Sequence, residues 1–225
     1  MLKQPTQKAD QVYELLRHSI IMLEIQPGAP IVEKDICAEL SVSRTPVREA
    51  VQKLAEEGLV NVIPHSGTYV SHISFQVAEE GFVIRRALEI ESVRRAAQRF
   101  DEAGGRELDA LGGRMRGLIE TGQLERYLDE DDALHAKIAQ MSGMPRIWKF
   151  ITLAKVHLDR MRQLSAPVPG HLAMVTEQLA AIVAAIRAGK PDQAELAMRI
   201  HLESSFDVMA RLYQERTSMF SQEAP

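Results

Sequence analysis

Two arginines, four residues apart, are the residues whose type and spacing first indicate a chemistry. Arg44 and Arg48 fall on one face at the start of a predicted helix. Planar guanidinium groups suit guanine O6 and N7 atoms or phosphate oxygens, and Thr45 with the open N–H groups of a helix start suits a phosphate. Because the helix dipole mildly disfavours cations at this end, the pair favours an external anion. The alternative is that both arginines form surface ion pairs with Glu49 or Asp35.

Three predicted helices and a hairpin would position these arginines. Apolar residues at helical spacing predict helices over roughly 8–25, 33–40 and 45–57. Two short runs rich in β-branched residues, 59–63 and 68–71, flank a turn with proline and glycine and predict a small hairpin. A short link before the third helix completes the pattern of a winged helix-turn-helix, in which that helix enters the DNA major groove.

From residue 75 onward the apolar spacing predicts helices only. Short breaks with glycine or proline between amphipathic helices predict an antiparallel bundle. The expected fold is therefore mainly α: a winged helix-turn-helix domain over 1–72, then an all-helical bundle of six to seven helices over 75–219. The predicted helical stretches are roughly 75–100, 103–121, 124–142, 144–165, 170–189 and 191–216.

Composition alone does not point to DNA. The 225 residues hold 27 Lys+Arg and 31 Asp+Glu, a net charge of −4, which would suggest a cytoplasmic enzyme. Cys37 is the single cysteine, which excludes an internal disulfide and a multi-cysteine zinc site. No apolar run approaches the ~18–20 residues of a membrane span, and no apolar signal core follows Met1, so we expect a cytoplasmic protein without a membrane partner.

A specific motif lies around the two arginines. Ser43-Arg44-Thr45-Pro46-Val47-Arg48-Glu49 is followed by Glu57-Gly58-Leu59-Val60 and preceded by Pro27-Gly28. Over 9–72 this pattern resembles the GntR family of bacterial transcription regulators. The resemblance implies contacts with double-stranded operator DNA from the third helix, from the helix before it and from the tip of the wing. The implied DNA-binding residues are Lys34, Arg44, Thr45, Arg48, Lys53, His65, Ser66 and Gly67.

Two of these residues have simpler interpretations. Lys53 points the same way as the recognition face, but it could equally be a solvated charge. A histidine in a turn, such as His65, is usually just solvated. Gly67 fits the wing because backbone approaches backbone closely there.

The resemblance extends past residue 75. Val83-Ile84-Arg85-Arg86-Ala87-Leu88-Glu89, Asp131-Asp132-Ala133-Leu134-His135 and Met198-Arg199-Ile200-His201 resemble the FCD effector domain of the FadR-like branch. The resemblance implies a helical bundle that binds a small molecule, commonly a carboxylic acid, often with a divalent metal. Arg85 and the pair Arg160 and Arg162 are candidates for the effector carboxylate, since a guanidinium pairs with it bidentately; each could equally be a surface residue.

The metal set implied by the resemblance is Asp131, His135 and His201. Asp131 and His135 are four residues apart, so both point to one helix face and can share an ion. Carboxylate and imidazole donors suit zinc, nickel or manganese. One ligand position departs from the family pattern, because the remaining histidine falls at Leu179, and leucine cannot coordinate. A three-ligand site can still hold a metal, more weakly, with water or effector completing it.

Two other histidines could replace the missing ligand. His157 is predicted on the fourth helix of the bundle, and His171 precedes Leu179 by eight residues. The alternatives are a core-lining histidine for His157 and a loop histidine for His171, and we favour these alternatives.

Together these features predict a ligand-responsive transcription regulator, on balance a repressor, that binds a palindromic operator as a homodimer. A dimer contacts two half-sites with its two DNA-binding domains, so it discriminates between DNA sequences more strongly than one domain does. A different interpretation is a metal-dependent enzyme in the bundle, with a DNA-localising head. That interpretation has metal donors but no evident nucleophile or base, and the only thiol, Cys37, lies in the N-terminal segment.

Overall fold

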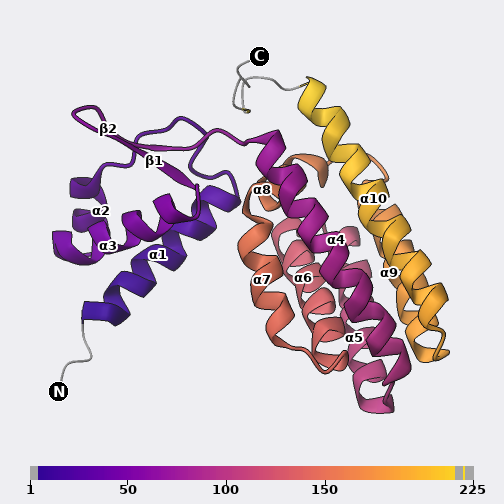
Figure 1. The fold of residues 1–225 in the computed structure, drawn as a ribbon. Coiled ribbons are helices and arrows are strands. Elements are labelled where there is room, and N and C mark those ends of the chain that lie inside the picture. The colour runs from indigo at the N-terminus through magenta and orange to yellow at the C-terminus, as the bar shows by residue number, and fades with distance from the viewer. Residues whose placement is uncertain (1–4, 216–219, 221–225) are drawn as a thin grey trace.

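A computed structural model describes residues 5–215 and residue 220. Figure 1 shows a small N-terminal part beside one end of a larger group of helices. We call α1 to β2 the head and α4 to α10 the bundle. The predicted mainly α fold, with a winged helix-turn-helix and a helical bundle, is confirmed. Residues 1–4 and 216–219 of the two predicted domains, and residue 216 of the last predicted helix, lie outside the described residues.

The head is built around the third helix, whose inner face is fully apolar. Val47, Ala50 and Leu54 follow the helical repeat and are buried against α1 and the hairpin. The two strands pair antiparallel from Val60 opposite Val70 to Ile63 opposite Gly67. The elements are α1 (Pro5–Ile21), α2 (Glu33–Glu39), α3 (Arg44–Glu56), β1 (Val60–Ile63) and β2 (Gly67–Val70).

The bundle has a separate hydrophobic core that its long helices share. No helix among the described residues is long and apolar enough to cross a membrane. The helices are α4 (Phe75–Gln98), α5 (Glu102–Glu120), α6 (Leu124–Met141), α7 (Arg146–Ala154), α8 (Val156–Ser165), α9 (His171–Arg187) and α10 (Pro191–Glu215).

The prediction of one helix over 144–165 is wrong, because the chain breaks at Lys155 into α7 and α8. The break is where α4 approaches most closely: a Cβ at Gly81 would lie 2.3 Å from the Ala154 carbonyl oxygen. Lys155 itself is buried, and its ammonium group pairs with Asp132 at 2.6 Å and Asp159 at 2.7 Å. Tertiary packing and this ion-pair network therefore accompany a break that no proline or glycine marks.

Helix α8 joins the head to the bundle. Val156 packs in the head core, whereas Leu158 packs in the bundle core. Nδ1 of His157 accepts a hydrogen bond from the Ser74 backbone N–H at 3.0 Å. In Figure 1, α8 lies at the end of the bundle that faces α1, and the two helices are in contact.

The buried His157 predicts a pH dependence of stability. Burial, with the charge of Arg160, lowers the pKa of His157 to about 4, against about 6.5 in an unfolded chain. Between these values the unfolded chain binds a proton that the folded chain does not, so the free energy of unfolding falls as the pH falls. One such histidine contributes up to about 1.4 kcal/mol per pH unit from pH 6.5 to 4.5.

Urea unfolding of the wild type and of His157→Gln at pH 7.0, 6.0 and 5.0, at one protein concentration, measures this contribution. We expect a smaller pH dependence in the variant, while buried His171 and His201, whose pKa values are also lowered, keep part of it in both proteins. Equal slopes in the two proteins would show that folding does not lower the pKa of His157.

Candidate functional site

The start of α3 presents an exposed, positively charged helix end. Arg44, Thr45 and Arg48 are exposed, while the opposite face of the same turns is buried in the head core. Ser43 occupies the N-cap position in extended backbone, and its side chain makes no capping hydrogen bond. The first backbone N–H groups are therefore not capped by a side chain, which suits an incoming phosphate oxygen.

The alternative interpretation, surface ion pairs with Glu49 or Asp35, does not describe the two arginines, although Arg48 has a different partner. Its Nε donates to Glu33 of α2 at 3.1 Å rather than to Glu49 or Asp35, and its side chain is 66% exposed. An exposed pair of this kind contributes at most about 1 kcal/mol, so a phosphate can displace it. Among the described residues, Arg44 makes no ion pair.

The remaining predicted DNA contacts differ in placement. Lys34 is exposed on α2. Lys53 lies in the last turn of α3, and its ammonium group pairs with Asp10 of α1 at 2.6 Å. It is therefore engaged by another residue of the head. His65, Ser66 and Gly67 form the exposed tip of the hairpin, with His65 in left-handed backbone at φ 61°.

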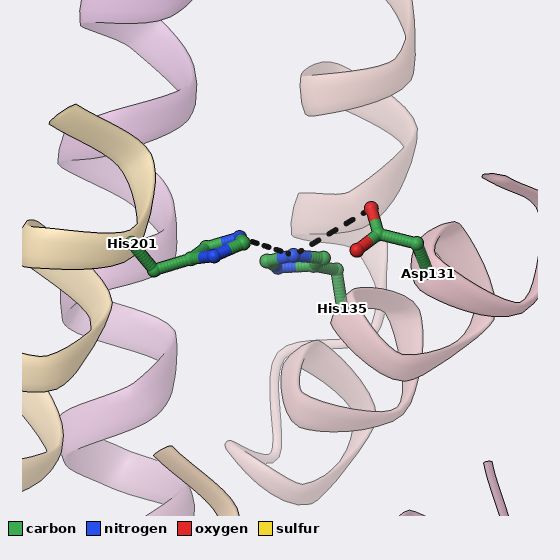
Figure 2. Close-up of side chains that lie close together, drawn as sticks. All are labelled: Asp131, His135 and His201. Atoms are coloured by element: carbon green, nitrogen blue, oxygen red, sulfur yellow. Dashed lines mark hydrogen bonds and ion pairs between the residues drawn. The ribbon is translucent and has the colours of Figure 1, made fainter. Parts of the chain in front are cut away.

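The bundle brings together the three predicted metal ligands. Asp131 and His135 come from α6 and His201 from α10, and one ligand atom of each lies within 4.8 Å of the others (Figure 2). The two Nε2 atoms of the histidines are 3.3 Å apart, and Nε2 of His135 is 4.0 Å from Oδ2 of Asp131. All three side chains are buried. We call them the Asp/His group.

The chemistry of the Asp/His group fits a divalent metal. Nδ1 of His135 pairs with the Glu89 carboxylate, which leaves Nε2 as the atom facing His201. Burial, with the nearby His135, lowers the pKa of His201 to about 3, so this imidazole stays neutral and able to ligate. Oδ1 of Asp131 has no hydrogen-bond partner among the described residues. A separation of 3.3 Å is close to the edge of a tetrahedron with metal–nitrogen bonds of about 2.0–2.1 Å.

Arginine side chains balance the buried carboxylates around this group. Nη2 of Arg162 donates to Asp131, and Nη1 donates to Asp132 at 2.8 Å. Burial alone would raise the pKa of Asp131, but the Arg162 charge holds it below its usual value. Arg85 is buried beside them, and its Nε donates to Glu89 at 2.5 Å.

Arg160, a candidate for binding an effector carboxylate, does not line the cavity beside the Asp/His group. Its guanidinium turns to the other side of α8 and donates to the Ser71 carbonyl oxygen at 2.8 Å. Arg162, two residues later, lines the cavity beside Asp131 instead. Because α8 is buried on all sides, its sequence carries no amphipathic signal that would have separated these two arginines.

The two other candidate histidines lie in different places. His157 binds Ser74 in the linker between β2 and α4 (residues 71–74) and does not join the Asp/His group. Leu179 lines a different hollow between α5, α6 and α9. His171 is buried and lines the same cavity as Asp131 and His201, and its Nδ1 has no partner among the described residues. Of the two substitutes, only His171 faces this cavity.

The cavity beside the Asp/His group is small, about 30 Å³. It has room for an ion with one or two waters but not for a carboxylic acid. An effector would therefore have to displace side chains that now fill this space.

Residues 8–70 match the family model described as bacterial regulatory proteins, gntR family, and residues 80–204 match the FCD domain. The chain belongs to the GntR family of bacterial regulators. It is 34% identical over 220 residues to the HTH-type transcriptional repressor RspR of Escherichia coli, covering 97% of this chain and 96% of that one.

Further relatives of this GntR-family chain are regulators too. A probable D-xylose utilization operon transcriptional repressor of Paenarthrobacter nicotinovorans is 28% identical over 200 residues, covering 88% of this chain and 86% of the relative. The solved structure of E. coli McbR/YncC superposes with a TM-score of 0.80 at 22% identity, covering 92% of this chain and 98% of that one. This likeness supports the fold. The domains and the relatives are those of DNA-binding transcription regulators and not of enzymes.

The metal prediction is tested on this GntR-family chain purified without a histidine tag and dialysed against zinc. We expect about one zinc ion per chain by atomic emission in the wild type, and its loss in Asp131→Asn and in His201→Ala, since each variant leaves only two ligands. His18→Ala, which removes an exposed histidine on α1, is the matched control and should keep the ion. Stoichiometric zinc that survives both ligand substitutions would place the site elsewhere.

Proposed function

We propose that this chain is a ligand-responsive repressor that binds a palindromic operator as a homodimer in the cytoplasm. The two functional units are a DNA-binding domain over 1–72 and an effector and dimerisation domain over 75–219. The observation that carries the proposal is the exposed start of α3, where Arg44, Thr45 and Arg48 surround backbone N–H groups that no side chain caps. Guanidinium groups at the N-terminal end of a recognition helix meet base edges in the major groove.

The DNA contacts divide by role. Arg44 and Arg48 read base edges, and Thr45 binds a phosphate. Lys34 on α2 and the wing tip at His65, Ser66 and Gly67 add contacts on either side of the helix. Lys53 contributes least, because it pairs with Asp10 at the far end of α3.

Dimerisation supplies the second reading head. Among the described residues, seven large apolar side chains of the bundle are exposed, and five of them lie on the two neighbouring helices α4 and α7. Such a concentration is typical of an interface with another protein surface, and we assign it to a second copy. The five residues are Val77, Val83, Ile84, Phe150 and Leu153.

The effector is a small carboxylic acid that binds beside the Asp/His group. Arg85 and Arg162 are the buried guanidinium groups that line this cavity, and each can pair with a carboxylate. Zinc, nickel or manganese held by Asp131, His135 and His201 would add a positive charge there. Repression is supported by the names of the relatives, since RspR and the D-xylose operon protein are both described as repressors.

The DNA-binding part is tested by footprinting and gel shift on the DNA upstream of the gene that encodes this chain. We expect protection of two symmetric half-sites about one helical turn apart. Arg44→Ala with Arg48→Ala should weaken binding at least about 100-fold, because each lost base contact costs ~1–3 kcal/mol. Arg106→Ala removes an exposed arginine from α5 in the bundle and should leave binding unchanged. Unchanged binding in the double variant would refute the assignment of α3, and protection of a single half-site would refute the dimer.

A further inference from the structure

We infer that α8 is the element that couples the Asp/His group to the head, with Arg162 as the residue that the metal or effector displaces. The inference rests on the proposed function, because it states how the same site is regulated. It starts from the burial of α8. Nine of its ten residues are buried, and four of those nine are ionisable: His157, Asp159, Arg160 and Arg162. Buried ionisable groups are retained only where each has a partner, so the partners define what the helix holds.

The ionisable residues of α8, together with Lys155 at its N-cap, lie on two opposite faces of the helix. At 3.6 residues per turn, Lys155, Asp159 and Arg162 lie within about 60° of one another, and His157 and Arg160 lie on roughly the other side. The first face holds the bundle, since Arg162 and Lys155 both pair with carboxylates of α6. The second face holds the head and its linker.

The contacts of the second face all fall where the head joins the bundle. Arg160 donates to the Ser71 carbonyl oxygen at 2.8 Å, and His157 accepts from the Ser74 N–H at 3.0 Å. His157 also lies close to Gly58, between α3 and β1: a Cβ at Gly58 would be 3.6 Å from Nε2 of His157. Val156 completes this face by packing in the head core. The orientation of the recognition helix thus depends on the position of α8.

The contacts of the first face reach the Asp/His group through a single side chain. One guanidinium nitrogen of Arg162 holds Asp131, while the other holds Asp132 at 2.8 Å and Asp159 at 3.1 Å. A cation bound at Asp131 takes the carboxylate that Arg162 now uses, and an effector carboxylate competes for Arg162 itself. In both cases α8 loses its attachment to the Asp/His group.

Loss of the contact between Arg162 and Asp131 affects how firmly the head is held. When the pair between Asp131 and Arg162 is lost, Arg162 is drawn toward Asp132 and Asp159 on the side of α1, and α8 shifts with it while its pairs with Asp132 remain. Because His157 and Arg160 lie on the same short helix, a shift weakens their hold on Ser74 and Ser71. The head then gains freedom relative to the bundle, which changes the operator affinity of a dimer that must place two heads at a fixed spacing.

Hydrogen–deuterium exchange of the full-length, metal-free protein tests this coupling. The backbone N–H of Ser74, which is bonded to His157, is the reporter, read in the peptide that spans 71–78. Asp131→Asn removes the attraction for Arg162 while keeping the shape of the side chain. We expect exchange at the linker to become at least about fivefold faster, the lower end of typical coupling between two sites.

Two further variants make the result decisive. Asp109→Asn removes a carboxylate that pairs with Arg187 between α5 and α9, and linker exchange should not change. Arg162→Lys keeps the positive charge, but one ammonium group cannot bridge Asp131 with Asp132 and Asp159 as the guanidinium does, so exchange should rise as in Asp131→Asn. This variant covers the case in which Asp131→Asn fails to fold.

The outcomes separate this inference from the proposed function. Linker exchange that stays at the wild-type rate in both Asp131→Asn and Arg162→Lys would overturn the role of α8, while operator binding that still depends on Arg44 and Arg48 would leave the proposed function standing. Exchange that rises equally in Asp109→Asn would also overturn it, because the effect would then be a general loosening of the bundle. Faster exchange in the two site variants alone supports the coupling.

Discussion

The structure depends on one electrostatic constraint, the neutralisation of three carboxylates, Asp131, Asp132 and Asp159, where α6 meets α8. Arg162 and Lys155 supply opposite charges and are buried together with Asp131 and Asp159, while Asp132 is partly exposed. Leaving one charge of such a buried pair without its partner costs roughly 3–5 kcal/mol, a large share of the stability of a domain. This network accompanies the break between α7 and α8, holds α8 against α6 and keeps Asp131 ionised beside the two histidines.

The same charge network makes the bundle sensitive to a bound ligand. A site in which every charge is fully paired gains little from an additional ion. The Asp/His group differs, because Oδ1 of Asp131 is buried without a partner among the described residues, while Oδ2 of the same carboxylate accepts from Arg162. A divalent cation at Asp131 uses the oxygen that the protein leaves free, and its positive charge competes with that of Arg162 for the carboxylate. Binding and rearrangement are therefore linked at a single carboxylate.

The head could be predicted from the sequence almost entirely. The apolar spacing of α3 determines which face is buried, and the motif from Ser43 to Glu49 identifies its family. Two of the three residues of the Asp/His group could also be placed together from the sequence, since the spacing of Asp131 and His135 puts both on one face of α6. The approach of His201 could be predicted only through the family resemblance, because His201 lies 66 residues after His135 in the chain.

The sequence was least informative at α8. No glycine or proline marks the break at Lys155, and a helix buried on all sides has no amphipathic pattern from which its faces can be assigned. Arg160 and Arg162 are therefore indistinguishable in sequence, although one binds the linker and the other binds Asp131. The pairing of Arg48 with Glu33 could not be predicted either, because Glu33 lies on a different helix and the spacing along α3 does not show which residues of α2 face it. These assignments require the tertiary structure, and they are the ones that connect the two domains.

Reciprocal linkage is the most direct test that the Asp/His group and the reading head belong to one regulatory unit. Any factor by which a ligand changes operator affinity must equal the factor by which the operator changes ligand affinity. Zinc binding is measured by isothermal titration of the full-length protein, first free and then saturated with the operator found by footprinting. We expect two dissociation constants that differ at least about fivefold. Equal zinc affinities in the presence of intact operator binding would contradict this expectation.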